Sequence, residues 1–490
     1  MNASVAIVGG GITGLTAAFR LAQKGLGVTV YEATGRVGGV IRSLRQAGYL
    51  AEFGPNSILE TSPKITGLIR DLGLEPRRLY SSPIAENRYI VRGARPVCLP
   101  LSPLAFFATE LFSARAKLRL LAEPFIRRAP ACAEENVADF VLRRIGREFL
   151  DYAINPLVAG VYAGEPSQLS VKHGFPKLHA VEQRYGSLIL GQILGAPERK
   201  RRGEVSKMEA KKISFDEGLQ VLTDTLHAKL GAAVRLNAQV NCLEQTAQGW
   251  AVTTSLSPIG GESQGEGAGR RQREETDAAH EHAAVLLAAP AYQLAQLELR
   301  AHAASRSLEP LAQVHYPPVA SVVLGFRRQD VAHPLDGFGM LIPRVEGFNI
   351  LGTLFSSSLF PGRAPAGHVT LTSYIGGVRA PQLALRSADE LVAMTMNDLR
   401  AILGVTGQPN FAHHVLYPKA IPQYVVGYGR FKDLMTQLER EAPGLFFAGH
   451  YRDGISLGDS IISAHNVADR IADYLRQEKT VAERACAASP

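Results

Sequence analysis

The sequence predicts an α/β protein whose centre is a Rossmann-like dinucleotide-binding domain. Three observations predict it: a strand, glycine turn and helix at the start of the chain, a second such unit near its end, and several short strands between them. The 490 residues allow two or three domains, and 46% hydrophobic with 20% charged residues is ordinary for packed globular protein.

The first motif follows a short apolar run. Gly9 permits a tight turn, Gly11 lets a pyrophosphate approach the backbone, and Gly14 allows the next helix to pack closely on the strand. A second apolar run, residues 28–31, ends at Glu32, whose carboxylate can accept hydrogen bonds from both ribose hydroxyls of an adenosine. The predicted cofactor contacts of this cradle are Gly9, Gly10, Gly11, Ile12, Thr13, Gly14, Glu32 and Ala33.

The residues after Glu32 favour FAD over NAD. Gly38 and Gly39 suit a second segment along the same pyrophosphate, with the Arg36 guanidinium meeting its charge. This extension resembles the amine-oxidase-like flavoprotein superfamily, and so does the loop 54–57, which lies near the isoalloxazine ring there. The resemblance adds the cofactor contacts Arg36, Gly38, Gly39, Val40, Gly54, Pro55, Asn56 and Ser57.

The second strand, turn and helix return the chain to the cofactor. An apolar strand, residues 445–448, runs into a glycine turn and then a small-residue helix over 461–471. In the superfamily this element closes over the flavin, with the helix N-terminus toward the pyrimidine side of the ring. Residues 447–458 contain no cysteine, so we expect FAD to be bound non-covalently. The predicted contacts are Gly449, Gly454, Ile455, Ser456 and Leu457.

Two competing sites are disfavoured. Ser456 lies in a glycine pattern that matches a hydrolase nucleophile elbow, but Asp459 and His465, the acid and histidine that follow it, stand beside the serine and not on later elements. His413 and His414 have no third ligand at useful spacing, so we expect no metal. Only one dinucleotide motif is found, which favours an oxidase that passes electrons to dioxygen or a quinone.

The segment between the motifs must also reach the cofactor. Residues 214–219 are predicted to start a helix, 233–236 and 239–243 to form short strands, and 285–290 to form the strand that closes the nucleotide domain. By resemblance, Val240 gives its backbone to the adenine.

The rest of the chain resembles the protoporphyrinogen oxidase family, in its plant and Gram-negative bacterial forms. The likeness is carried by residues 155–166 with Leu169 and Ser170, and by 337–343, 351–358, 360–365, 374–377 and 451–456, and it spans about residues 5–475. It implies a tetrapyrrole substrate and oxidation of protoporphyrinogen IX to protoporphyrin IX in haem and porphyrin biosynthesis. It further implies three two-electron steps through FAD to dioxygen, with release of hydrogen peroxide.

The resemblance also implies roles for individual residues. Arg88 pairs with a propionate, Leu341 and Leu354 sandwich a pyrrole ring, and the carbonyls around Gly160 and Gly164 face the pyrrole N–H groups. Tyr374 stands where plant members have phenylalanine, which keeps the stacking face and adds a hydroxyl that needs a partner. The sequence identifies no catalytic acid or base.

The resemblance predicts a discontinuous domain organisation. The segments are 1–86, 207–300 and 430–476 for the FAD-binding domain, 87–92 and 301–429 for a mixed-sheet substrate-binding domain, 93–206 for a helical membrane-associating domain, 257–280 for a flexible loop and 477–490 for a loose tail. Residues 99–121 predict a helix with Phe106, Phe107, Leu111 and Phe112 near one face. Such a face suits either membrane contact or ordinary packing.

Charge and hydropathy limit partners and location. A net charge of +8 favours anionic partners, and a basic cluster at Arg199–Arg202, Lys207, Lys211 and Lys212 suits a solvated loop or a lipid head-group contact. The cluster lacks the interleaved aromatics of a nucleic-acid groove. No run of eighteen apolar residues or charged leader appears, so we expect a cytoplasmic protein on the inner face of the cell membrane. The family likeness also allows a homodimer.

Three other functions stay open. A flavin-type coproporphyrinogen III oxidase would need more cationic groups for two further carboxylates. A flavin amine oxidase would need an aromatic cage at the flavin. A flavin-binding protein without catalysis would leave the long apolar segments without a purpose.

Overall fold

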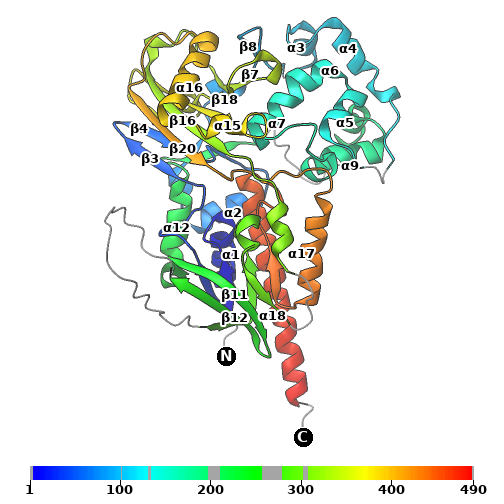
Figure 1. Cartoon of the computed structure of the whole chain (residues 1–490), viewed down its shortest axis with the longest axis vertical. Helices are drawn as coiled ribbons and strands as arrows, with labels where there is room; N and C mark the ends of the chain where they lie inside the picture. Colours follow the sequence, from blue (N-terminus) through cyan, green and yellow to red (C-terminus); the bar gives the residue numbers. More distant parts are fainter. Residues whose placement is uncertain are drawn as a thin grey trace.

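The computed structural model describes residues 4–100, 102–130, 134–196, 210–256, 279–301 and 307–487, with side chains to residue 480. Two layered regions lie one above the other, and both chain termini lie at the end of the lower one (Figure 1). The fold is α/β with mixed sheets, as the sequence predicts. No helix among the described residues is long and apolar enough to cross a membrane.

The lower region is built on a five-stranded parallel sheet. Its order is β10 (Val234–Arg235), β2 (Gly27–Tyr31), β1 (Ser4–Val8), β14 (Ala284–Leu287) and β21 (Leu445–Phe447). Strand β1 is apolar and almost fully buried because both faces are covered. Helix α1 (Ile12–Gln23) packs on this strand and in turn contacts α12 (Gln220–Leu230) and α18 (Leu457–Ala487).

A second, mostly antiparallel sheet packs against the same core. It consists of β13 (His280–His282), β12 (Gly249–Leu256), β11 (Ala238–Thr246) and β15 (Glu298–Arg300). Helix α17 (Gly429–Glu441) leads into β21. The tip between β12 and β13, for which we predict a flexible loop, lies outside the described residues except for its last two positions.

The upper region holds a seven-stranded sheet. Its order is β20 (Phe411–Tyr417), β16 (Val319–Arg327), β19 (His368–Gly376), β18 (Ile350–Leu354), β17 (Gly337–Leu341), β7 (Asn87–Arg92) and β8 (Arg95–Cys98). All neighbours are antiparallel except β17 and β7. An apolar core between one face and α16 (Ala388–Leu403) contains Tyr89, Met340 and Ile375.

Smaller strands join the two regions. They are β3 (Ser43–Gln46), β4 (Tyr49–Glu52), β5 (Ile58–Leu59), β6 (Arg78–Tyr80) and β9 (Lys212–Phe215), and α2 (Pro63–Asp71) follows β5. Strand β9 lies between β5 and β6. Our prediction that residues 214–219 start a helix is wrong: Ser214 and Phe215 end β9, and α12 begins only at Gln220, after the turn that Gly218 allows at φ +91°.

Short helices flank the seven-stranded sheet. They are α3 (Pro103–Ala108), α4 (Ala114–Leu121), α5 (Val137–Arg144), α6 (Arg147–Phe149), α7 (Asn155–Tyr162), α8 (Val171–Gly174), α9 (Pro176–Tyr185) and α10 (Leu188–Leu194). A buried ion cluster ties them together: Arg144 contacts Glu123 at 3.0 Å and Glu182 at 2.5 Å. Glu123 also accepts hydrogen bonds at the start of α10, which satisfies its charge.

Two further predictions are wrong. Residues 99–121 form two helices, and Leu111 and Phe112 lie buried in the break between them while Phe107 stays 54% exposed. Ser113 caps α4 through the Ala116 N–H, which fixes that break. The predicted loose tail begins inside α18, which continues to Ala487 because no proline or glycine interrupts it.

Candidate active site

The glycine turn after β1 is shaped by close backbone contacts. A Cβ on Gly14 would lie 2.0 Å from the Gly9 carbonyl oxygen, and one on Gly9 would lie 2.8 Å from the Ala289 nitrogen. A Cβ on Gly11 would meet no atom within 4 Å, and no side chain caps the start of α1 there. The turn is therefore packed on its inner side and open at the helix N-terminus, where a phosphate can approach.

Glu32 is held at the end of β2 beside this turn. Its Oε2 accepts a hydrogen bond from the Gly10 N–H at 2.7 Å, and its Oε1 accepts one from the Thr34 N–H at 2.9 Å. The Ala238 N–H donates to the Glu32 carbonyl at 2.9 Å. Strand β11 therefore begins beside Glu32 and brings Val240 to the predicted adenosine side of the cradle.

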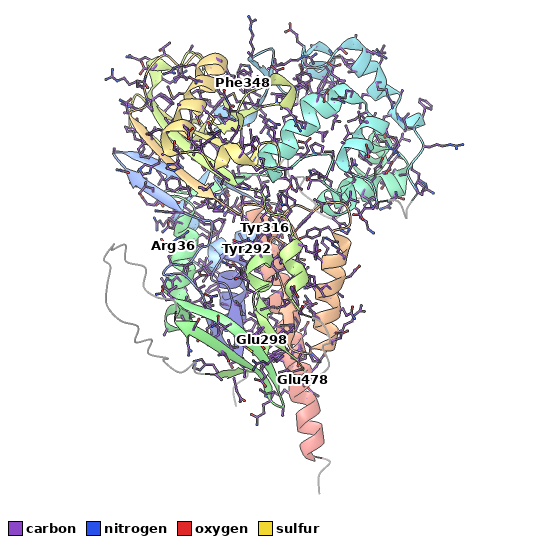
Figure 2. The ribbon with its side chains drawn as sticks, in the orientation of Figure 1. Arg36, Tyr292, Glu298, Tyr316, Phe348 and Glu478 are labelled. Atoms are coloured by element: carbon purple, nitrogen blue, oxygen red, sulfur yellow. The ribbon has the colours of Figure 1, made fainter. Side chains whose placement is uncertain are left out.

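The second glycine segment lies against the first. The Gly38 N–H donates to the Gly10 carbonyl at 2.9 Å, and a Cβ on Gly54 would fall 2.2 Å from the Val40 carbonyl oxygen. Arg36, labelled in Figure 2, donates to the carbonyls of Val37, Gly39 and Ile41. In this structure its guanidinium fixes the shape of the glycine segment.

The loop between β21 and α18 is held by hydrogen bonds to a tyrosine that was not predicted from the sequence. The Tyr424 hydroxyl donates to the His450 carbonyl at 2.5 Å and accepts from the Gly454 N–H at 3.0 Å, so it joins both ends of the loop before α18. The Gly449 N–H donates to the Ser463 hydroxyl at 3.2 Å. No local pattern marks Tyr424, because its partners lie about thirty residues away.

Ser456, Asp459 and His465 do not form the catalytic triad that a hydrolase would need. The Ser456 hydroxyl accepts the Asp459 N–H at 3.1 Å and so caps α18. His465 accepts a hydrogen bond from Arg20 at 3.2 Å and does not meet Ser456. Among the residues that the structure describes, no cluster of three or more histidine, cysteine or acidic side chains is arranged to hold a metal ion.

Strand register places four predicted substrate residues on one face of the seven-stranded sheet. Arg88 pairs with Gly339, two residues before Leu341. Leu341 pairs with Gly352, two residues before Leu354, and Gly352 pairs with Tyr374. Directly paired residues and residues two apart share a face, so all four side chains project away from the core beneath α16. We call this surface the substrate face.

Helix α7 covers the substrate face. A Cβ on Gly160 would lie 2.3 Å from Leu341 Cδ2, so only glycine leaves room for that side chain. A Cβ on Gly164 would lie 2.5 Å from the Gln423 side-chain oxygen, and Gln423 donates to the Tyr162 carbonyl at 2.7 Å. Gln423 was not predicted from the sequence, and it fixes the end of α7 over the sheet.

The substrate face meets the predicted flavin loop at Tyr374. The Asn56 side-chain amide donates to the Tyr374 hydroxyl at 2.6 Å, and that hydroxyl donates to the Gly54 carbonyl at 3.3 Å. Burial raises the pKa of Tyr374 well above its usual range, so the phenol stays neutral. The Tyr374 hydroxyl therefore has hydrogen-bond partners, as we expect for a buried phenol.

Two titratable groups lie where the segments converge. Burial, and after it the charge of Asp459, raise the pKa of Tyr162 to about 12, so the end of α7 lies near the start of α18. Burial lowers the pKa of His450 to about 4, so its imidazole is neutral at ordinary pH. The His450 ring lies 5.8 Å from Tyr316, which Figure 2 labels with Tyr292.

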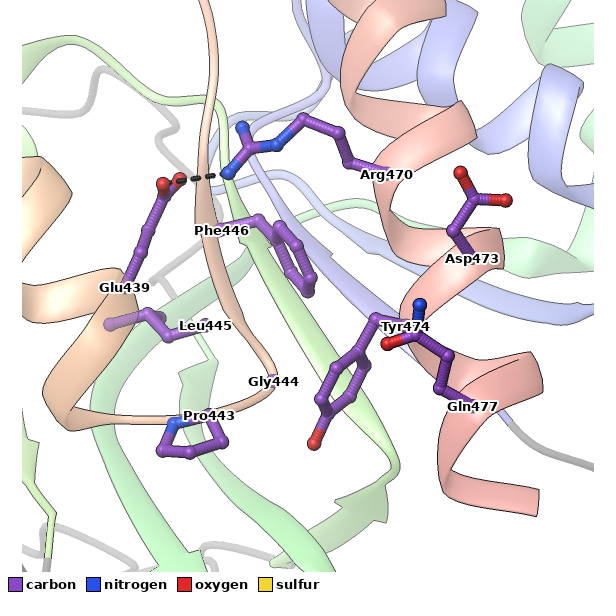
Figure 3. A pocket seen from close by; sticks show the side chains of 9 residues that line it. All are labelled: Glu439, Pro443, Gly444, Leu445, Phe446, Arg470, Asp473, Tyr474 and Gln477. Atoms are coloured by element: carbon purple, nitrogen blue, oxygen red, sulfur yellow. Dashed lines mark hydrogen bonds and ion pairs between the residues drawn. The ribbon is translucent and has the colours of Figure 1, made fainter. Parts of the chain in front are cut away.

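A surface cavity lies at the other end of β21. It is lined by residues that include Pro443, Phe446 and Tyr474, and an ion pair of 2.7 Å between Arg470 and Glu439 crosses it (Figure 3). Ligands of open parallel sheets bind at the carboxyl ends of the strands, whereas this cavity borders the amino end of β21. It is therefore separate from the nucleotide cradle.

The fold and the cradle define a dinucleotide-binding protein whose segments fit FAD. The open helix start at Gly11 suits the pyrophosphate, Glu32 suits the ribose, and the loop at Asn56 joins the cradle to an apolar sheet face.

Comparison with known proteins gives the family. Residues 12–472 match the model of the family described as "Flavin containing amine oxidoreductase". Protoporphyrinogen oxidase 2, chloroplastic/mitochondrial, of Arabidopsis thaliana is 37% identical over 96% of this chain and 94% of that protein. Coproporphyrinogen III oxidase of Bacillus subtilis is 28% identical over 96% of this chain and 98% of that protein.

Solved structures support the fold. The crystal structure of a protein from Exiguobacterium sp. 255-15 covers 97% of this chain and 99% of its own, with 23% identity and a TM-score of 0.78. The chain belongs to the flavin-containing amine oxidoreductases, in the branch that contains the protoporphyrinogen oxidases. It is an FAD-dependent oxidoreductase.

Proposed function

We propose that this enzyme oxidises protoporphyrinogen IX to protoporphyrin IX with dioxygen as acceptor. The observation that carries the proposal is the substrate face, where one cation, Arg88, shares a surface with Leu341, Leu354 and Tyr374 beside the flavin loop. A tetrapyrrole needs this combination, because its ring system is apolar and its propionates are anionic.

The chain's own residues act mainly by positioning. Arg88 binds a propionate, Leu341 and Leu354 hold a pyrrole ring, and Tyr374 offers its ring as a stacking surface. Bound FAD supplies the hydride acceptor. Each turnover removes one hydride and one proton, and three turnovers convert one porphyrinogen and three dioxygen molecules into one porphyrin and three hydrogen peroxide molecules. Holding the substrate's bridging carbon in a dry pocket accounts for most of the rate.

We assign the remaining predicted contacts to the same site. Gly160 keeps α7 close enough to exclude water from Leu341, and Val240 presents its backbone to the adenine. The five-stranded sheet region binds FAD, the seven-stranded sheet region binds substrate, and the helices between β8 and β9 flank the entrance.

The test is turnover with purified holoenzyme. Anaerobic addition of protoporphyrinogen IX should bleach the flavin absorbance, and admission of air should restore it with porphyrin fluorescence and a 3:1 ratio of peroxide to porphyrin. Absence of flavin bleaching contradicts the proposal. Faster turnover of coproporphyrinogen III would assign the enzyme to that substrate, and a peroxide ratio near zero would exclude dioxygen as acceptor.

We further propose that the short helices lie on the cytoplasmic face of a membrane. Five exposed apolar side chains around α3 and α4 support this: Leu104, Phe107, Leu118, Leu121 and Phe125, with Leu104 85% and Phe125 88% exposed. Sedimentation with vesicles of anionic and neutral lipid measures the contact. The variant Phe107→Ser with Phe125→Ser should lose it and retain turnover of detergent-dispersed substrate, whereas unchanged sedimentation contradicts the proposal.

A further inference from the structure

Helix α7, which covers the substrate face, begins after a break in the regular helical hydrogen bonds. The residues before it, Leu150–Ile154, form a π-helical turn in which the Asn155 N–H donates to the Leu150 carbonyl. The next residue, Pro156, has no N–H to donate. Because its own hydrogen bonds do not fix the start of α7, contacts with other elements must hold that end over the sheet.

The buried side chain of Asn155 makes these contacts. Its Oδ1 accepts hydrogen bonds from the Arg344 N–H and from Arg379 Nη2, each at 3.0 Å. Arg344 lies just after the end of β17, and Arg379 lies just after the end of β19. One amide therefore ties the start of α7 to the ends of the two strands that carry Leu341 and Tyr374.

Arg379 depends on this amide for one of its hydrogen bonds. Its Nη1 donates to the Ile342 carbonyl at 2.9 Å, and its buried Nε has no hydrogen-bond partner among the described residues. Burial lowers the pKa of Arg379 to about 10, against the opposing charge of Glu165, so the guanidinium stays protonated at neutral pH. An acceptor for a partly buried cation is costly to lose, so the contact with Asn155 resists separation of α7 from the sheet.

The same segment also holds the other end of α7. The Val378 N–H donates to the Ala163 carbonyl at 2.8 Å, and Ala163 ends α7 in the left-handed conformation at φ +51°. A Cβ on Gly377 would lie 2.5 Å from the Ala163 carbonyl oxygen, so the two backbones are in close contact. Residues 377–379 therefore hold α7 at both ends.

Between these ends, little free space separates α7 from the sheet. A Cβ on Gly160 would lie 2.3 Å from Leu341 Cδ2. Ala159 and Ala163 of the same helix are buried in a cluster with Leu351 of β18. Protein interiors packed this closely transmit a displacement and do not absorb it. A shift of the start of α7 would therefore change the space beside Leu341.

We propose that Asn155 is a positioning residue for the substrate, because it sets the width of the space between α7 and Leu341 in which a pyrrole ring is held. This inference rests on the proposed function. Asn155 acts through α7 and does not touch the ring. The consequence lies in kcat, because a ring displaced by about 1 Å misaligns the bridging carbon that loses hydride.

The test measures anaerobic flavin bleaching by protoporphyrinogen IX in the variants Asn155→Leu and Asn155→Asp. Leucine has a similar size but no acceptor, whereas aspartate keeps an acceptor for both donors. At saturating substrate, Asn155→Leu should slow bleaching about 10- to 100-fold, and Asn155→Asp should stay within about threefold of wild type. The FAD content and the rate of reoxidation by dioxygen should be unchanged in both variants, because Asn155 lies outside the nucleotide cradle.

Asn136→Leu is the matched control. Asn136 accepts the Asp139 N–H at 2.8 Å and caps α5 in the same group of helices. Loss of this cap should lower the free energy of unfolding and leave the bleaching rate unchanged. Equal slowing by Asn136→Leu and Asn155→Leu would reveal a general effect of weakened helices and overturn the positioning role.

Arg379→Gln removes the same contact from its other side and serves also if Asn155→Leu does not fold. Glutamine is too short to reach both acceptors, so bleaching should again slow, and the double variant should be no slower than the slower single variant. A wild-type rate in Arg379→Gln, or effects that multiply, overturn the inference while wild-type bleaching leaves the proposed function intact. Wild-type enzyme that the substrate does not bleach overturns both.

Discussion

The nucleotide cradle and the substrate face build their sites by different means. The cradle uses main-chain groups from segments in which glycines touch backbone, as at Gly14 and Gly9. The substrate face uses side chains from four strands, from Arg88 to Tyr374, which only register brings together. The cradle should therefore tolerate no added atoms where its glycines touch backbone, whereas the substrate face should tolerate changes in size and lose mainly affinity.

The largest expected effect tests the cradle. Gly14→Ala places a methyl group 2.0 Å from the Gly9 carbonyl oxygen, a backbone atom that cannot move aside. We expect loss of about 3 kcal/mol or more of unfolding free energy and little bound FAD. Chemical unfolding and flavin absorbance measure both.

Gly11→Ala is the matched control for that variant. Its methyl group meets no protein atom within 4 Å, so unfolding of the apoprotein should change by only about 1 kcal/mol while FAD binds at least roughly tenfold more weakly. Equal destabilisation of both apoproteins would contradict the distinction between the inner and outer sides of the turn.

Glu52 lies where the two regions meet, and its protonation makes the free energy of unfolding depend on pH. Its carboxylate accepts the Leu219 N–H at 2.7 Å and lies 3.7 Å from Arg363. Burial raises its pKa to about 7 from 4.5. The folded state then binds the Glu52 proton more tightly than the unfolded state does. This difference stabilises the fold by about 3 kcal/mol below about pH 4.5, and the stabilisation is lost as the pH rises through 7.

Glu52→Gln should remove this dependence. The difference in unfolding free energy between wild type and the variant, measured from pH 4.5 to 8, should change by about 3 kcal/mol and then level off. A difference that is constant across this range would show that Glu52 does not titrate there. Buried histidines titrate equally in both proteins, so they cancel.

Arg88→Met tests whether the substrate face acts through single side chains. Loss of a charged hydrogen bond of about 2 kcal/mol should raise KM for protoporphyrinogen IX about 30-fold, with FAD content unchanged. Arg95→Met, at an exposed arginine of the neighbouring strand β8, should leave KM unaltered. If the Arg88→Met variant lost FAD, the cradle and the substrate face would not bind their ligands independently.

The smallest expected effect is at the contact between the regions. Tyr374→Phe keeps the ring and removes the hydroxyl that Asn56 binds at 2.6 Å. We expect a loss of about 1 kcal/mol in stability and a change in kcat of only a few fold. A large fall in kcat with unchanged stability would instead give the hydroxyl a direct part in the reaction.

Local patterns predicted the cradle well because its contacts follow from neighbours in sequence. The run from Gly9 to Gly14 and the acid at Glu32 lie where the strand, turn and helix demand. The same reasoning was wrong for residues 99–121, where the cap at Ser113 divides an apolar run into two helices. It was also wrong for the tail, because a helix without breakers continues past the core.

The sequence by itself determined the α/β class and the two glycine turns, since these depend on local backbone conformation. Only the tertiary structure decided that Tyr424 joins both ends of the closing loop and that Gln423 fixes the end of α7. These contacts join residues distant in the chain, and no local preference records which strands will be neighbours.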